Sequence, residues 1–343
     1  METVMEKNGK ENMLLEVRDL KVSFFTPAGE VKAVDGISYS LRYNEVMGIV
    51  GESGSGKSVE AYAIMGLLQN PGRITNGSIT FEGEDILSYS PEQMRQFRGN
   101  KVSMIFQNPM TCLNPVFTVG NQLSEALMVH DRTITKDEAW ARAREMLRLV
   151  GVNNPDRRLK QYPHEFSGGM RQRAMIAMAL ICDPKLLIAD EPTTALDVTI
   201  QAQILRLMKD LQKRVNTSII FITHNLGVVA EICDRVSVMY GGHIVEQGSV
   251  NDIFYNPQHP YTKGLLASMP RIDDESKEKL IPIEGTPIDL LNPPVGCNFG
   301  PRCANCMKIC TKVKPPFTDL GNGHISACWL HHREAAVKGT EEQ

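Results

Sequence analysis

A glycine-rich loop between an apolar run and a helical stretch is the strongest chemical signal in this sequence. Residues 51–58 read Gly-Glu-Ser-Gly-Ser-Gly-Lys-Ser and fit the pattern G-x-x-x-x-G-K-[ST] in full. Glycines let backbone N–H groups turn toward phosphate oxygens, and the positive end of the following helix adds to the attraction. Lys57 would place its charge on the β- and γ-phosphates, and Ser58 would offer its hydroxyl to Mg²⁺. The loop therefore predicts a nucleotide site that contains Ser53, Gly54, Ser55, Gly56, Lys57 and Ser58.

A pair of carboxylates, Asp190 and Glu191, ends a second apolar run, Leu186–Ala189. In enzymes with a phosphate loop, an Asp at the end of such a strand holds Mg²⁺. A neighbouring Glu can accept a proton from the attacking water. A strand that merely ends in acidic residues is common, but the phosphate loop in the same chain favours the chemical interpretation.

Cysteines crowd the end of the chain, where five of the eight follow residue 296. A disulfide scaffold would be small and secreted, so this cluster is first interpreted as a set of metal or cluster ligands. Four thiolates can hold an iron–sulfur cluster or a tetrahedral zinc ion, and the close pair Cys303 and Cys306 suits zinc equally well on spacing alone. Because apolar periodicity is poor there, we expect the ligated group to hold together a tail without a core of its own.

Alternating strands and helices must position these residues. Buried strands are expected at Val46–Val50, Lys101–Phe106, Leu186–Ala189 and Ile219–Ile222, because these are short apolar runs. Helices are expected at Ser58–Leu68, Thr135–Val150, Met170–Ile181 and Thr199–Arg214, and a hairpin around Gly241 and Gly242. This order predicts an α/β core with a largely parallel sheet, interrupted by a mainly helical insert.

Composition narrows the range of functions. The chain has 343 residues, which allows about two domains. Its formal net charge of −3 does not attract it to nucleic acid or to anionic lipid. Its polar first residues lack the apolar segment of a secretory signal, and its longest apolar runs are too short to span a bilayer, so any membrane role is expected to come through a partner.

The segment 167–173, Ser-Gly-Gly-Met-Arg-Gln-Arg, resembles the signature motif of ABC transporter ATPases. Further motifs follow in the order of that family: Gln107 resembles the Q-loop glutamine, Ala195-Leu196-Asp197 the D-loop, and His224 the switch histidine. Phe24 stands where the family stacks an aromatic ring on adenine, with Phe25 as the alternative. Each motif alone is weak evidence, and their joint order carries the resemblance.

The resemblance implies a P-loop NTPase core of the ABC type that hydrolyses ATP with Mg²⁺. The ATPase domain would cover residues 13–270, with core segments 13–106 and 179–270 around a helical subdomain of residues 107–178. Glu191 would be the general base, His224 and Gln107 would act with it, and Ser58, Gln107 and Asp190 would hold Mg²⁺. Ser167, Gly168, Gly169 and Asp197 would complete the nucleotide site of a second ATPase subunit, in a head-to-tail pair.

Finer features resemble the ATPases of bacterial dipeptide and oligopeptide importers, namely residues 104–115, 189–203 and 259–266 and the Arg-Cys pair at 302–303. In that subfamily a similar cysteine spacing binds a four-iron four-sulfur cluster, which maps onto Cys297, Cys303, Cys310 and Cys328 in a C-terminal linker and module of residues 271–343. Cys306 would then not be a ligand. A zinc ion is the alternative to the iron–sulfur cluster.

Partners follow from the same resemblance. They would be a second ATPase of different sequence, two permease subunits and an extracytoplasmic peptide-binding protein, with no nucleic acid. The chain would then lie at the cytoplasmic face of the membrane without inserting into it. Two other functions stay open: the same role for another solute such as nickel or an oligosaccharide, and a soluble ABC ATPase acting on DNA or ribosomes. A single set of motifs and a short insert argue against the second.

Overall fold

The computed structural model describes residues 12–107, 112–194, 197–269 and 282–332 of the chain. These residues divide into two compact units, and the chain passes from one to the other several times. The first unit comprises residues 12–15, 40–46 and 80–222, and the second comprises residues 16–39, 47–79 and those from 223 onward.

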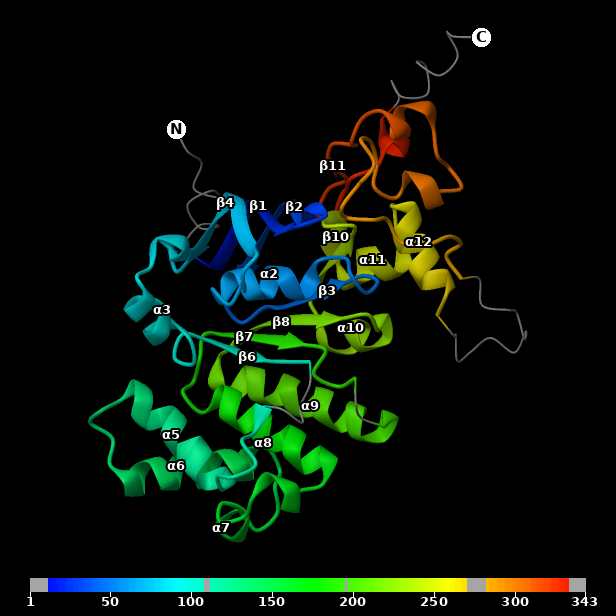
Figure 1. Cartoon of the computed structure of the whole chain (residues 1–343). Helices are drawn as coiled ribbons and strands as arrows, with labels where there is room; N and C mark the ends of the chain where they lie inside the picture. Colours follow the sequence, from blue (N-terminus) through cyan, green and yellow to red (C-terminus); the bar gives the residue numbers. More distant parts are fainter. Residues whose placement is uncertain (1–11, 108–111, 195–196, 270–281, 333–343) are drawn as a thin grey trace, which may run out of the picture. The chain divides into compact units, whose positions relative to one another are not determined.

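The elements keep the labels of Figure 1. The strands are β1 (Met13–Thr26), β2 (Gly29–Arg42), β3 (Val46–Val50), β4 (Gly72–Phe81), β5 (Glu84–Asp85), β6 (Val102–Ile105), β7 (Leu186–Asp190), β8 (Ser218–Thr223), β9 (Arg235–Tyr240), β10 (His243–Ser249), β11 (Thr318–Asp319) and β12 (Ile325–Ser326). The α-helices are α2 (Lys57–Ile64), α3 (Pro91–Phe97), α5 (Val119–His130), α6 (Lys136–Leu149), α7 (Pro155–Arg158), α8 (Gly168–Leu180), α9 (Val198–Val215), α10 (Leu226–Ile232), α11 (Val250–Tyr255) and α12 (Pro260–Ala267). The 3₁₀ helices are η1 (Ile86–Ser88), η2 (Pro163–Glu165), η3 (Gly300–Arg302), η4 (Lys308–Thr311) and η5 (Trp329–His331).

Three parallel strands of the first unit lie in the order β8-β7-β6. Every residue in them is buried. Continuous apolar runs of this kind belong to parallel strands that are covered on both faces. The predicted bounds of these three strands agree with the observed bounds to within one residue at every end.

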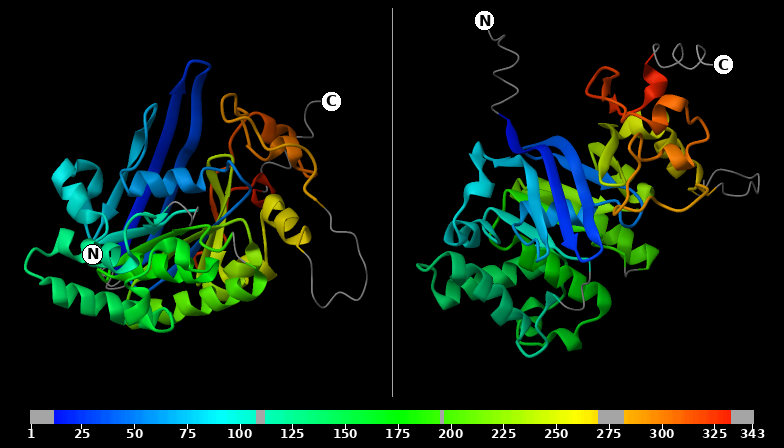
Figure 2. Two further views of the ribbon diagram at one scale, coloured as in Figure 1. Left: turned by 60° about the horizontal axis from the view of Figure 1, so that its bottom comes forward. Right: turned by 45° about the horizontal axis from the view of Figure 1, so that its top comes forward.

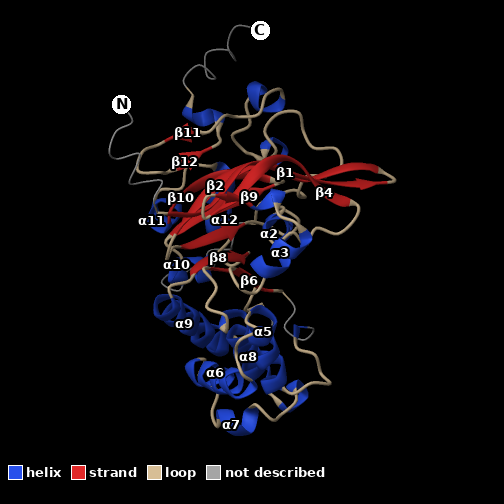
Figure 3. Cartoon of the chain, turned by 90° about the vertical axis from the view of Figure 1, so that its left-hand side faces the viewer, coloured by secondary structure: helices blue, strands red, loops and turns tan. Residues whose placement is uncertain are grey.

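The helical part of this unit consists of α5, α6, α7 and α8. The start of α6 is fixed by a capping box, in which the Thr135 hydroxyl accepts from the N–H of Glu138 and the Glu138 carboxylate accepts from the N–H of Thr135. Ala143 and Leu147, one turn apart, are fully buried, as the amphipathic spacing predicts. Figure 3 shows these helices as one group, with the strands of the unit on one side of it.

The sheet of the second unit has the order β11-β12-β10-β9-β3. Strand β3 pairs with β9 in parallel, and the predicted hairpin is confirmed as the antiparallel pair β9 and β10. Gly241 and Gly242 connect these two strands with φ angles of 53° and 79°, which glycine adopts without steric cost. Helix α2 is shorter than predicted, because Gly66 with φ of 59° follows its C-cap and ends it.

The C-terminal segment 282–332 belongs to the second unit, where β12 pairs with β10. Figure 2 shows this segment, in orange to red, beside the yellow helices α11 and α12. The segment also packs on earlier residues of this unit, because Phe299 is only 4% exposed. Its ring centroid lies 5.2 Å from that of Tyr240 and 5.3 Å from that of Tyr261. Aromatic packing of this kind needs no periodic pattern, which is why the sequence did not reveal it.

Both units alternate strands with helices, so the α/β class predicted from the sequence is confirmed. Among the described helices, none combines the length and the apolar character needed to span a bilayer.

Candidate functional site

The phosphate loop lies in the second unit, between the end of β3 at Val50 and the start of α2 at Lys57. Two of its glycines are required by close backbone approaches. A Cβ atom on Gly51 would lie 2.1 Å from the Met239 carbonyl oxygen, and one on Gly56 would lie 2.3 Å from that of Ala33. Gly56, at the N-cap of α2 with φ of 102°, carries no side chain to cover the amide groups of the first turn.

Lys57 is folded back over this loop. Its Nζ donates hydrogen bonds of 2.8 Å to the carbonyl oxygens of Gly51 and of Glu52, and the residue is only 6% exposed. Ser53 and Gly54 at the loop tip are exposed, whereas Ser55 is buried. The loop thus presents its tip to solvent and keeps a lysine at its base, as a phosphate cradle requires.

The predicted metal and water site lies in the first unit, at the end of β7. Asp190, its last residue, is 1% exposed. Glu191 follows with φ of 47°, and its N–H donates to the carbonyl oxygen of Ile222. A left-handed backbone at a residue other than glycine is strained and is typical of functional sites. The Glu191 carboxylate accepts from the Gln107 amide at 2.9 Å and from the Thr194 hydroxyl at 3.0 Å.

The signature segment opens α8 in the same unit. Ser167 is its N-cap, and its hydroxyl accepts from the N–H of Met170. Ser167 and Gly168 are exposed, and a Cβ atom on Gly168 would meet nothing within 4 Å. The start of α8 therefore offers backbone N–H groups to an outside partner.

Gln172, also in α8, was not singled out from the sequence. It is 1% exposed, and its Nε2 donates to the carbonyl oxygen of Pro192. This contact ties the signature helix to the segment after Glu191. Its place in the signature segment 167–173 is the sequence signal that could have marked it.

The remaining predicted residues are divided between the units. Asp197 caps α9 in the first unit by accepting from the N–H of Ile200, whereas Ala195 and Leu196 lie outside the described residues.

In the second unit, His224 follows β8 and is exposed. The Phe24 ring packs against Gly72, and the Arg73 guanidinium lies 4.0 Å from the centroid of the Phe25 ring. The structure therefore places the predicted residues in two groups, one in each unit.

The five C-terminal cysteines lie in one small fold of the second unit. The N–H of Cys297 donates to the carbonyl oxygen of Cys310 at 2.7 Å, and that of Cys306 donates to the carbonyl oxygen of Cys303 at 3.1 Å. Burial, with a smaller contribution from the nearby thiols of Cys310 and Cys328, raises the pKa of the Cys297 thiol to about 11.

The other thiols show the same proximity. Burial, together with the neighbouring Cys303 and Cys310, raises the pKa of the Cys328 thiol. Cys306 is exposed, whereas Cys310 and Cys328 are buried. In the described part of the chain, no three side chains of His, Cys, Asp or Glu converge closely enough to hold a metal ion. The positions of these side chains therefore do not themselves support the predicted ligation, which remains a proposal.

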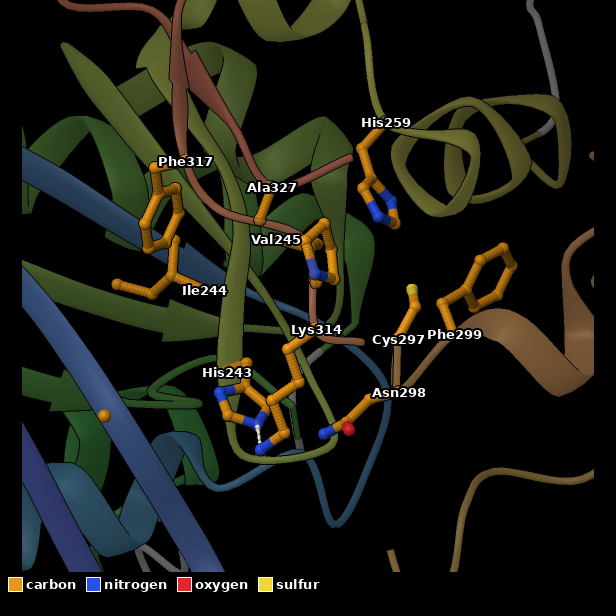
Figure 4. A pocket seen from close by; sticks show the side chains of 12 residues that line it. His243, Ile244, Val245, His259, Cys297, Asn298, Phe299, Lys314, Phe317 and Ala327 are labelled. Carbon is orange, nitrogen blue, oxygen red and sulfur yellow. Dashed lines mark hydrogen bonds between the residues drawn. The ribbon is translucent and has the colours of Figure 1, made fainter. Parts of the chain in front are cut away.

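A cavity of about 70 Å³ adjoins this cysteine fold (Figure 4). The Cys297 sulfur points toward the side formed by His259 and Phe299, and His243 and Lys314 are hydrogen-bonded on the other side. Burial lowers the pKa of His259 to about 3, so this imidazole is neutral at physiological pH. The cavity is too small for a nucleotide, which leaves the phosphate loop as the nucleotide site of this unit.

A cavity of about 580 Å³ lies in the first unit. Strand β6 and helices α5 and α8 contribute to it. Its lining is mostly apolar and consists of Gly99, Ser103, Met104, Ile105, Phe106, Cys112, Ala126, His130, Met175, Met178, Ala179 and Cys182.

Two family models match the chain in sequence. The ABC transporter family matches residues 34–194, and the C-terminal region of the oligopeptide/dipeptide transporters matches residues 245–310. The second match includes Cys297, Cys303, Cys306 and Cys310.

Curated relatives resemble the chain over most of its length. The oligopeptide transport ATP-binding protein OppD of Bacillus subtilis is 56% identical over 323 residues, which cover 94% of this chain and 90% of the relative. The dipeptide transport ATP-binding protein DppD of the same organism is 55% identical and covers 94% of this chain and 96% of the relative.

Among solved structures, the dimeric post-hydrolysis state of the ATP-binding cassette MJ0796, bound to ADP and Pi, matches with a TM-score of 0.62 and 24% identity. The match covers 69% of this chain and 99% of the cassette. It confirms the phosphate-loop ATPase fold expected from the motifs. With relatives of such high identity over nearly the whole chain, this protein belongs to the ABC transporter family and, within it, to the ATP-binding subunits of the oligopeptide and dipeptide type.

Proposed function

We propose that this chain hydrolyses ATP to power the uptake of dipeptides or oligopeptides. The observation that carries the proposal is the 56% identity to the oligopeptide transport ATP-binding protein OppD, over 94% of the chain. The phosphate loop, the carboxylates after β7 and the signature segment support it. We assign residues 13–270 to the ATPase domain and residues 271–343 to a C-terminal linker and module, whose strand β12 pairs with β10.

ATP is held by the phosphate loop, with Ser53, Gly54, Ser55 and Gly56 turning their backbones toward the phosphates. Lys57 moves its ammonium from the carbonyl oxygens of the loop to the β- and γ-phosphates, and Phe24 stacks on adenine. The short Lys57 contacts to Gly51 and Glu52 support this role, because the charge is already at the base of the cradle.

Hydrolysis uses the groups of the first unit together with His224. Glu191 takes the proton of the attacking water, and His224 orients that water and the γ-phosphate. Ser58, Gln107 and Asp190 hold Mg²⁺. Bound Mg²⁺ supplies positive charge that offsets the charge developing on the γ-phosphate.

A second ATPase subunit, of different sequence, completes each nucleotide site. Ser167, Gly168 and Gly169 of one subunit face the γ-phosphate held by the other, and Asp197 lies at the same interface. The exposure of Ser167 and Gly168 supports this arrangement, because their N–H groups are accessible to an anion from outside the chain.

Two permease subunits hold the pair at the cytoplasmic face of the membrane, and an extracytoplasmic protein delivers the peptide. The largely apolar cavity lined in part by Phe106, which precedes Gln107 in the chain, is the docking site that we propose for a permease segment. Its three methionines, Met104, Met175 and Met178, are flexible side chains that adapt to a partner surface.

The C-terminal module holds a four-iron four-sulfur cluster through Cys297, Cys303, Cys310 and Cys328. The spacing of these four cysteines, which resembles that of the subfamily, supports this choice of ligands. Zinc is the second candidate, because four thiolates also form a structural zinc site. In this proposal the cluster takes no part in ATP hydrolysis.

Uptake measurements on whole cells test the transport function. Loss of the gene should abolish uptake of labelled di- and oligopeptides, and the wild-type chain should restore it while the Glu191→Gln chain does not. Loss of nickel or oligosaccharide uptake with normal peptide uptake would instead assign the ATPase to another solute. Unchanged uptake of all these solutes would favour an ABC ATPase without a permease.

A further inference from the structure

An ion pair joins the cysteine module to the phosphate loop inside the second unit. The Arg302 guanidinium is bidentate on the Glu52 carboxylate, with Nη1 2.6 Å from Oε2 and Nη2 3.1 Å from Oε1. The Arg302 side chain is only 4% exposed, and that of Glu52 is 27% exposed. Glu52 is the second residue of the phosphate loop, and Arg302 immediately precedes Cys303.

Arg302 is held in one orientation by further groups. Its Nε donates to the carbonyl oxygen of Glu284 at 3.0 Å and its Nη2 to that of Ile283 at 3.1 Å. The guanidinium also lies 5.7 Å from the centroid of the Tyr240 ring. A planar cation fixed by so many partners loses little freedom when it binds a carboxylate, so it is suited to fixing the position of that carboxylate.

Glu52 transmits this position to the loop through its backbone. Its N–H donates to the hydroxyl of the buried Tyr261 at 2.9 Å, and its carbonyl oxygen accepts from Lys57 Nζ at 2.8 Å. The same residue therefore contacts Arg302 through its side chain, α12 through its N–H, and the phosphate-binding lysine through its carbonyl group.

A loop that binds phosphates through backbone N–H groups gains affinity when it is already ordered, because ordering on binding costs conformational entropy. We propose that Arg302 is a positioning residue for the nucleotide site: through Glu52 it keeps the phosphate loop ordered before ATP binds, so that the cysteine module contributes to ATP affinity. This proposal rests on the ATP-binding role of the loop and not on which group the cysteines bind.

The test is equilibrium binding of Mg-ATP, measured with a fluorescent ATP analogue on the full-length chain. Arg302→Gln and Glu52→Gln should each raise the Kd by about fivefold, as expected for a partly buried bidentate pair. The double variant should be no weaker than the worse single variant, because both changes remove the same interaction. Lys312→Gln, an exposed charge of the same module, is the matched control and should leave the Kd unchanged.

Steady-state hydrolysis separates positioning from chemistry. The variants should have a higher KM for ATP with an unchanged kcat, because the pair acts on binding of the ground state and of the transition state alike. Arg302→Lys, which keeps the charge but cannot be bidentate, should fall between wild type and Arg302→Gln. Limited proteolysis after residue 270 reports whether the module is still folded.

An unchanged Kd in Arg302→Gln and Glu52→Gln, with the module resistant to protease, would overturn the proposal. So would losses that add up in the double variant, because the two residues would then act independently. If Arg302→Gln does not fold, Glu52→Gln decides the question, since Glu52 is partly exposed. Failure of the wild-type chain to bind Mg-ATP would contradict the ATP-binding role itself, which is a separate outcome.

Discussion

The side-chain amide of Gln107 donates a hydrogen bond of 2.9 Å to Oε2 of Glu191. Gln107 follows β6 and Glu191 follows β7, and these two strands are parallel neighbours in the sheet of the first unit. The contact therefore joins two loops at the carboxyl ends of adjacent strands, where α/β folds assemble their binding sites. It brings together two of the residues that the motifs assigned to hydrolysis.

Glu191→Gln should reduce ATP hydrolysis by about 10²–10⁴-fold and leave ATP binding intact, because it removes a general base and spares the phosphate loop. Steady-state hydrolysis and equilibrium binding of Mg-ATP check this. Glu125→Gln, at an exposed position of α5, is the control. Hydrolysis near the wild-type rate in Glu191→Gln would contradict the proposed role.

Lys57→Ala should weaken ATP binding itself, because it removes the charge that lies 2.8 Å from the carbonyl oxygens of Gly51 and Glu52. The expected loss is at least about tenfold in affinity, since hydrogen bonds to charged groups contribute about 1.5–3 kcal/mol. The same binding assay measures it. An affinity equal to that of the wild type would contradict the proposal that Lys57 binds the phosphates of ATP.

Glu60 predicts a pH dependence of stability. Burial raises its pKa from 4.5 to about 8, although the hydrogen bond from the Tyr39 hydroxyl lowers it. Between these two values the folded chain keeps a proton that the unfolded chain has lost, so the free energy of unfolding falls as pH rises through this window. Glu60→Gln removes the titration, and its Tm relative to wild type should increase from about pH 5 to about pH 8.

Thermal unfolding of both proteins across that pH range measures this difference. Gln keeps the oxygen that accepts from Tyr39, so any cost of the amide is the same at every pH. A Tm difference that does not change with pH would show that Glu60 is ionised in the folded chain.

The proposed cluster predicts a coloured protein when it is made without oxygen. Iron and acid-labile sulfide should be present, and Cys306→Ser should retain the colour because Cys306 is exposed and outside the ligand set. Single Ser variants of Cys297, Cys303, Cys310 or Cys328 should lose it. A colourless protein with one zinc per chain would reverse the assignment, and loss of colour in Cys306→Ser would change the ligand set.

The sequence predicted the local elements well where one segment carries its own signal. The run Val46–Val50 is buried on both faces and forms β3 with the predicted bounds, and Ser167 caps α8 as its residue type suggests. These features depend on neighbouring residues, which a pattern can detect.

Contacts between distant segments were not predictable in this way. Arg302 and Glu52 are 250 positions apart, and only the path of the chain brings them together. The Arg-Cys pair at 302–303 stood out by resemblance, but nothing in it indicated a contact with the phosphate loop. Likewise, Phe299 packs on Tyr240 and Tyr261 without any periodic spacing, so the packing of the C-terminal segment on earlier residues was not predicted.

The pairing of β12 with β10 has a consequence for chain truncation. Glu246 and Gln247 of β10 face Ser326 and Ile325 across this ladder, and the middle of β10 is buried throughout. A chain cut between residues 271 and 292 would turn β10 into an edge strand with unpaired N–H and C=O groups. Such edges recruit strands from other molecules. By pairing with β10, the C-terminal segment thus prevents edge-to-edge aggregation. An ATPase core produced without this segment is expected to self-associate.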